Sequence, residues 1–133
     1  MKYLLDTNIC IYFLNKTEKI KEKIDKIPSD DISVSLITLA ELQFGAYNST
    51  HVQDNLRRVE FFEKTVQTVS LTSEITEEYA RIKSKLRKSG RPVDDFDILI
   101  GATAIVGNLT LVTNNERHFA HMDGLRLENW ITG

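Results

Sequence analysis

The chain of 133 residues has room for one domain, because typical domains hold ~100–200 residues. Hydrophobic residues make up 41% and charged residues 27%, and with only six Gly and two Pro this composition excludes disordered and collagen-like chains. The formal net charge of −2 gives no overall attraction to nucleic acid, so a polyanion would need a local basic patch or a bound cation.

The cysteine content and the start of the chain indicate the cellular compartment of the protein. Cys10 is the single cysteine, which excludes a disulfide scaffold and a C-x-x-C zinc site, and we expect it to be buried. Lys2 is followed by only three apolar residues before Asp6, far fewer than the ~7–15 of a signal peptide. No stretch approaches the ~20 apolar residues of a membrane span. We therefore expect a cytoplasmic protein without membrane contact.

The first half of the chain alternates short apolar runs with amphipathic segments. Strands are predicted where an apolar run ends in polar residues and where side chains alternate with period two, at Tyr3–Leu5 and Ile32–Ser35. Helical spacing and breaking residues predict helices at Ile9–Leu14, from about Glu18 to Pro28, from Thr38 through Ala46, and at Val52–Phe62.

The second half continues the alternation. Strands are predicted at Val66–Leu71 and Leu109–Val112, with an edge strand at Leu125–Leu127. A long amphipathic helix opens at Ser73 and is broken at Gly90-Arg91-Pro92, and a very apolar helix follows at Ile98–Val106. No repeat or linker divides the chain. The pattern predicts an α/β fold over residues 1–133, with a mostly parallel central sheet and helices on both faces.

Three acidic residues occupy matching places in this pattern. Asp6 directly follows the first strand, Glu41 lies in the first turn of the helix after the second strand, and Asp97 lies in the first turn of the apolar helix. The carboxyl ends of parallel strands share one edge of the sheet with the helix starts that follow them. We therefore expect the three carboxylates to converge on one pocket.

Each acid also has a purely structural explanation. Asp6 could cap the next helix, and the segment Thr38–Glu41 fits a capping box in which Glu41 reaches back to the cap. Asp94, Asp95 and Asp97 could be acids favoured by the helix dipole, with Asp95 as the expected cap. Taken one at a time, the structural explanation is favoured.

Taken together, the three acids favour a cation site. Glu41 and Asp97 are surrounded by apolar residues, which predicts partial burial. At ~5 Å and an effective dielectric of ~20, each like-charged pair costs roughly 3 kcal/mol, so three pairs approach the stability of a domain. A divalent cation relieves this repulsion at neutral pH, and all-oxygen ligands favour Mg²⁺ or Mn²⁺.

Five segments carry a family resemblance. They are LDTN at Leu5–Asn8, AELQFG at Ala40–Gly45, DILIGATA at Asp97–Ala104, LVTNNERHF at Leu111–Phe119 and LRLENW at Leu125–Trp130. In this order the chain resembles the PIN-domain ribonucleases from residue 2 to residue 131, and more narrowly the VapC toxins of bacterial type II toxin–antitoxin modules.

The resemblance implies a single PIN domain over residues 1–133 in which Asp6, Glu41 and Asp97 are the catalytic acids and bind one or two Mg²⁺ or Mn²⁺ ions. It implies hydrolysis of single-stranded RNA or exposed tRNA and rRNA loops to 5′-phosphate and 3′-hydroxyl products, which inhibits translation and growth. It also implies a homodimer that a VapB antitoxin silences in a larger complex, with the C-terminal segment of the antitoxin crossing the active-site groove.

The chain departs from the family at one position. His118 stands where many relatives carry a fourth acid, which predicts a weaker second metal site. We expect His118 to be a solvent-facing loop residue rather than a metal ligand. We expect four further residues to surround the metal-binding acids without holding the cation as main ligands. These secondary positions are Asn8, Asp95, Asn115 and Glu116.

The densest basic run of the chain precedes Asp97. From it we select as candidate RNA-binding residues Lys83, Arg87, Lys88 and Arg91, although a solvated helix face explains the run equally well. Two other functions stay open at this point. One is a PIN-fold RNA-binding or regulatory module with weak catalysis. The other is a phosphoacceptor receiver, which ranks third because Asp6 lacks a paired acid and no lysine follows the last buried strand.

Overall fold

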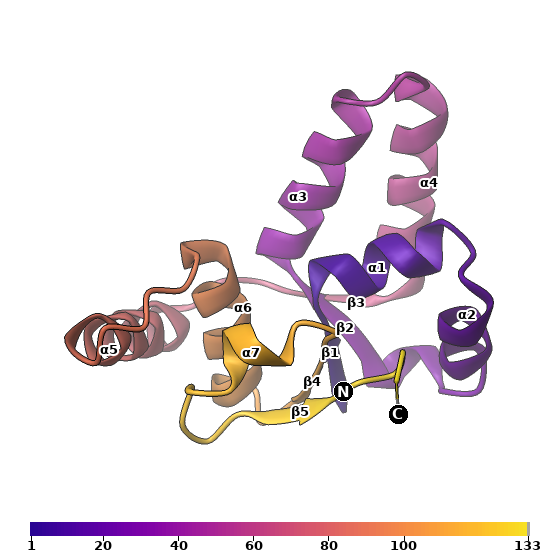
Figure 1. Cartoon of the computed structure of the whole chain (residues 1–133). Helices are drawn as coiled ribbons and strands as arrows, with labels where there is room; N and C mark the ends of the chain where they lie inside the picture. The colour runs from indigo at the N-terminus through magenta and orange to yellow at the C-terminus, as the bar shows by residue number, and fades with distance from the viewer. Residues whose placement is uncertain (133) are drawn as a thin grey trace.

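A five-stranded sheet lies at the centre of the computed structural model, which describes residues 1–132 (Figure 1). In chain order the strands are β1 Tyr3–Leu5, β2 Ile32–Ser35, β3 Gln67–Val69, β4 Thr110–Val112 and β5 Arg126–Glu128. They lie side by side in the order β3-β2-β1-β4-β5, and every neighbouring pair is parallel. The order reverses between β1 and β4, and such a reversal is where open α/β sheets bind ligands.

Helices cover both faces of the sheet, as predicted. They are α1 Thr7–Leu14, α2 Glu18–Asp25, α3 Leu36–Tyr47, α4 Val52–Thr65, α5 Ser73–Lys88, α6 Asp95–Val106 and α7 Glu116–Phe119, with a 3₁₀ turn, η1, at Ser29–Asp31. Alternate side chains of a strand point to opposite faces, so Leu5 packs with α1 to α4 while Leu4 packs with α5 to α7. Helices α3 and α4 form a hairpin that projects beyond the sheet (Figure 1).

Helix starts are where the sequence predictions need correction. Asp6 does cap α1, because its Oδ1 accepts a hydrogen bond from the Ile9 amide at 2.9 Å. The proposed capping box in α3 is wrong: this helix begins at Leu36, and the Ser35 hydroxyl caps it by accepting from the Ile37 amide at 3.0 Å. Glu41 therefore lies in the second turn of α3 and not in the first.

The start of α6 differs in the same way. Asp94, and not Asp95, is the cap, because its Oδ2 accepts from the Phe96 amide at 3.2 Å. Asp97 lies in the first turn, as predicted. Helix α7 and the turn η1 were not predicted, since four and three residues are too few to show a helical period.

Two further expectations concern burial and membranes. Cys10 is fully buried in the core beside β1, as expected. Within residues 1–132, no helix combines the length and the apolar character that crossing a membrane requires.

Two glycines inside helices predict opposite effects of the same substitution. A Cβ added at Gly101 of α6 would lie 2.5 Å from Sδ of Met122, and Met122 and Phe119 beside it are buried. We expect Gly101→Ala to lower the free energy of unfolding by about 1–3 kcal/mol through overpacking. Gly45 of α3 has no atom within 4 Å of an added Cβ. We expect Gly45→Ala to raise the free energy of unfolding by about 0.5–1 kcal/mol, because alanine has a higher helix propensity than glycine. Urea unfolding of both variants tests this, and equal effects would contradict it.

Candidate active site

Asp6 lies at the junction of β1 and β4, where the strand order reverses. The register pairs Leu5 with Val112, and the Asp6 amide donates to the Val112 carbonyl at 3.0 Å. Thr113, the residue after β4, is thereby placed opposite Asp6, and its hydroxyl donates to Oδ2 of Asp6. Only 4% of Asp6 is exposed, so its carboxylate is one of the few buried charges of the molecule.

Glu41 reaches the same region from α3. Its Oε1 accepts a hydrogen bond from the Thr7 hydroxyl at 2.6 Å, which ties α3 to the start of α1. The Thr7 hydroxyl also lies 3.1 Å from the hydroxyl of Thr38, which is fully buried one turn before Glu41. Two threonines therefore fix the position of the Glu41 carboxylate.

Asp97 comes from the opposite face of the sheet, in the first turn of α6. Its Oδ2 lies 2.9 Å from Nδ1 of His118 on α7, and 26% of the Asp97 side chain is exposed. His118 is half exposed, as expected, but it lies on a helix and touches one of the predicted metal-binding acids. The position that departs from the family pattern is therefore part of the site.

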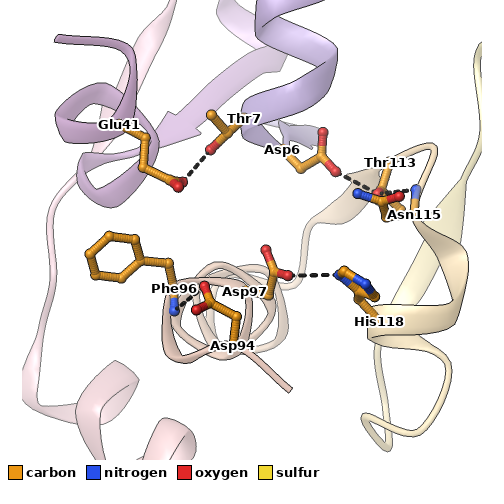
Figure 2. A network of polar contacts seen from close by, with 9 residues as sticks. All are labelled: Asp6, Thr7, Glu41, Asp94, Phe96, Asp97, Thr113, Asn115 and His118. Carbon is orange, nitrogen blue, oxygen red and sulfur yellow. Dashed lines mark hydrogen bonds and ion pairs between the residues drawn. The ribbon is translucent and has the colours of Figure 1, made fainter. Parts of the chain in front are cut away.

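The three carboxylates face one space, although they come from three elements (Figure 2). Asp6 lies at the start of α1 with its carboxylate directed toward Thr113, Glu41 extends from α3, and Asp97 points up from α6. Each of them has a separate protein partner, namely Thr113, Thr7 and His118. The cluster is thus built from residues far apart in sequence that the sheet edge brings together.

Burial raises the pKa of both Asp6 and Glu41 above the ordinary values for these carboxyl groups. For Asp6, hydrogen bonds from Thr113 and Ile9 lower the pKa in part, and the charges of Asp97 and Glu41 raise it further. For Glu41, the bond from Thr7 lowers the pKa, and Asp97 raises it. Loss of hydration is therefore a larger cause than the mutual repulsion from which the sequence argument started.

The chemistry of these donors fits a hard divalent cation. The carboxylates of Asp6, Glu41 and Asp97 provide oxygen atoms around one space, and Mg²⁺ needs only one or two carboxylates because it keeps several waters. Within residues 1–132, no three Asp, Glu, His or Cys side chains lie close enough together to hold a metal ion as they stand. A cation in this space would therefore take one or two carboxylates as ligands and water for the rest.

The four secondary positions lie in different places. Asp95 turns away toward α5, where its Oδ1 accepts from the Tyr79 hydroxyl at 2.9 Å and lies 2.8 Å from Nζ of Lys83. These two partners lower the pKa of Asp95. Glu116 also turns away, since it accepts from the Asn129 side chain at 3.3 Å.

Asn115 and Asn8 stay close to the predicted metal ligands in the chain. The Asn115 amide donates to the Thr113 hydroxyl at 2.9 Å, so the backbone at the start of α7 orients the side chain that binds Asp6. Asn8 is exposed in the first turn of α1. Of the four positions, only Asn115 has a hydrogen bond that leads to a cluster carboxylate through one intermediate residue.

Two threonines of the site, Thr7 and Thr113, were not singled out from the sequence, and Thr38 was considered only as a helix cap. The available signal was their position, since Thr7 directly follows Asp6 and Thr113 directly follows the strand beside β1. Hydroxyl groups at such positions can supply the hydrogen bonds that a buried carboxylate requires.

Comparison with known proteins agrees with this geometry. The PIN domain family model matches residues 3–125. The chain is 34% identical over 132 residues to Ribonuclease VapC2 of Rickettsia felis, and 34% identical over 131 residues to the tRNA(fMet)-specific endonuclease VapC of Shigella flexneri, with 98% of both chains covered in each case. A chain in the crystal structure of DNA-bound VapBC from Salmonella typhimurium superimposes with a TM-score of 0.92 at 34% identity, covering 98% of each chain. The protein therefore belongs to the PIN-domain family and, within it, to the VapC ribonucleases.

Proposed function

We propose that this chain, as a VapC endoribonuclease, hydrolyses RNA phosphodiester bonds at the space between Asp6, Glu41 and Asp97, with Mg²⁺ or Mn²⁺ as the cofactor. The observation that carries this proposal is the convergence of three carboxylates from three elements at the β1–β4 junction of a PIN domain. The domain extends over residues 1–133. Dependence on a divalent metal is general in PIN nucleases.

The contacts of each acidic side chain indicate its role in the proposed hydrolysis. A cation held by these oxygens would polarise the scissile phosphate and lower the pKa of a coordinated water. Asp6 is held rigidly by the Ile9 amide and the Thr113 hydroxyl, which suits a ligand whose position must not change. Glu41 keeps one oxygen on Thr7 and leaves the other free to orient a water or accept its proton. Asp97 keeps 26% of its side chain exposed, and we assign it, together with His118, to contact with the incoming phosphate.

The raised pKa of Glu41 supports its role as a proton acceptor. A base acts best when its pKa approaches the working pH, and burial moves the pKa of Glu41 upward from the ordinary glutamate value. The Thr7 hydrogen bond limits this increase in the pKa, because it favours the ionised carboxylate.

Substrate and partners follow from the family. One relative is named a tRNA(fMet)-specific endonuclease, so we propose single-stranded RNA or an exposed tRNA or rRNA loop as the substrate, with cleavage inhibiting translation in the cytoplasm. We also propose a homodimer that a VapB-type antitoxin neutralises in a higher-order complex. Exposed aromatic side chains on the α3–α4 hairpin, at Phe44, Tyr47 and Phe61, support protein contacts there.

An apolar groove beside the carboxylates supports the antitoxin assignment. Ile11 and Leu14 of α1, Leu42 of α3 and Val59 of α4 line it, and Glu41 lies at its margin. An apolar segment seated in this groove would therefore end against the active site and block access of RNA.

Of the two alternative functions, the phosphoacceptor receiver is rejected and the PIN-fold module with weak catalysis is left to experiment. The receiver is not retained, because a receiver requires a lysine after the last buried strand, whereas Thr113 follows β4 here and the chain belongs to the PIN family. A PIN module with weak catalysis is separated from a nuclease by the next experiment.

Replacing Asp97 tests the nuclease. We expect Asp97→Asn to lower RNA cleavage by at least about 100-fold, because loss of a metal ligand should exceed the 10–100-fold effect of losing a partner that only orients one. The melting temperature without metal should stay close to that of the wild type. Added Mg²⁺ or Mn²⁺ should raise the melting temperature of the wild type and not of the variant.

The matched control is Asp123→Asn, which removes an exposed acid that pairs with Lys85 outside the site. It should cleave RNA at the wild-type rate. Unchanged cleavage by Asp97→Asn would contradict the assignment, and a wild-type protein that ignores both cations would favour the module with weak catalysis.

The pKa of Asp6 generates a prediction about stability. Because the folded-state pKa is raised, the unfolded chain releases this proton first as the pH rises above the ordinary value of 3.8. Asp6 therefore destabilises the metal-free protein increasingly until the pH has passed the raised pKa. Asparagine still caps α1 but carries no charge. We expect the melting temperature of Asp6→Asn, relative to that of the wild type in EDTA, to increase between about pH 4 and pH 7. A difference that is constant or decreasing with pH would be inconsistent with a raised pKa.

A further inference from the structure

A cleft of ≈ 440 Å³ lies between the segment that precedes α6 and helix α7. Its polar lining comes from Arg91 and Asp94 on one side and from Arg117, His118 and His121 on the other. The sequence between these segments forms α6 and β4, so only the fold brings the two sides together.

This cleft opens directly beside the carboxylates. His118 lines it and at the same time contacts Oδ2 of Asp97 at 2.9 Å. Asp94 lines it and caps the helix that carries Asp97. A strand whose phosphate lies beside Asp97 would therefore pass His118 and extend into this cleft with the next part of its backbone.

The charges of the cleft favour an anion. Among residues 1–132, no carboxylate lies within ion-pair distance of the guanidinium groups of Arg91 and Arg117. The imidazole of His121 can add an N–H donor, whereas Nδ1 of His118 is already in contact with Asp97. Asp94 is the only acid in the lining, and its Oδ2 is already bound to the Phe96 amide. Two free arginines facing one cleft suit the geometry of phosphate oxygens.

Three of the five cations of α5 are paired within the chain, whereas Arg87 and Lys88 have no ion pair among residues 1–132. Lys83 pairs with Asp95 at 2.8 Å, Lys85 pairs with Asp123, and Arg81 pairs with Glu78. Cations that already have carboxylate partners release fewer counterions on binding RNA, so they add less to its affinity. Charge density along the sequence therefore overestimates the contribution of this helix.

We propose that the cleft between Arg91 and Arg117 binds a backbone phosphate of single-stranded RNA next to the scissile phosphate, and that it, rather than the exposed face of α5, fixes the strand in the site. This inference rests on the proposed function, because it names the path by which the substrate of that site enters. Arg91 and Arg117 are assigned to binding, and no step of the chemistry is assigned to them.

The test measures RNA binding in a background that cannot cleave. Glu41→Gln is suitable, because Glu41 lies across the site from the cleft and glutamine retains an acceptor for Thr7. Binding of a fluorescein-labelled single-stranded oligoribonucleotide is followed by anisotropy over a series of salt concentrations, with a gel check that the RNA stays intact. The variant with Arg91→Gln and Arg117→Gln should weaken binding at least about tenfold at low salt and flatten the salt dependence by about 0.7 for each lost phosphate contact.

Two matched variants complete the binding measurement. Arg87→Gln with Lys88→Gln removes two cations from α5, and Arg57→Gln removes an exposed arginine of α4 that pairs with Asp54. Both should change affinity by less than about threefold. The proposal is overturned if the cleft variant binds like its parent, or if the α5 variant accounts for the loss. The single substitutions and melting temperatures show whether a loss of binding reflects misfolding.

Cleavage kinetics separate this proposal from the proposed function. In the otherwise wild-type chain, Arg91→Gln with Arg117→Gln should raise KM and leave kcat within about twofold, since uniform binding is lost. If the wild type cleaves no RNA while its RNA binding still depends on both arginines, the nuclease proposal is contradicted and the proposal that the cleft binds RNA is retained. If cleavage is normal while RNA affinity and KM are unchanged by the loss of both arginines, the proposal that the cleft binds RNA is contradicted and the nuclease proposal is retained.

Discussion

The buried carboxylate of Asp6 is the constraint on which the site depends. A carboxylate removed from water must be hydrogen-bonded, and here the Ile9 amide and the Thr113 hydroxyl provide the bonds. The first bond starts α1, and the second joins the ends of β1 and β4. The same interactions therefore begin a helix, join the ends of two strands and place the carboxylate that we propose as a metal ligand where the strand order reverses.

The carboxylates of Asp6, Glu41 and Asp97 are each held by a contact with a neighbouring side chain. Each of the three carboxylates has its own donor, so the repulsion between them is partly offset by hydrogen bonds from two threonines and a contact with His118. Burial still raises the pKa of Asp6 and Glu41, which means that their ionised forms remain unfavourable. On the proposed function, a divalent cation would offset this cost while keeping several water ligands.

Several cationic side chains elsewhere on the molecule form ion pairs with acidic residues. The net charge is −2, and several lysines and arginines of α5 are bound to nearby acids. Arg91 and Arg117 remain without such partners among the described residues, and both face the cleft beside Asp97. On the proposal above, a protein without overall attraction to RNA holds a strand locally, because two arginines that are unpaired among the described residues lie in the cleft beside Asp97.

The sequence determined the order of strands and helices, since apolar periods of two and 3.6 residues report which faces are buried. It also placed Asp6, Glu41 and Asp97 at one edge, because parallel strands end together. Tertiary structure decided which neighbouring acid does what: Asp95 and Asp97 lie roughly 200° apart around α6, so one meets Lys83 and the other faces the site. It also decided the caps Ser35 and Asp94, and the approach of Arg117 and His118 to α6. These depend on how helices pack, which no local pattern records.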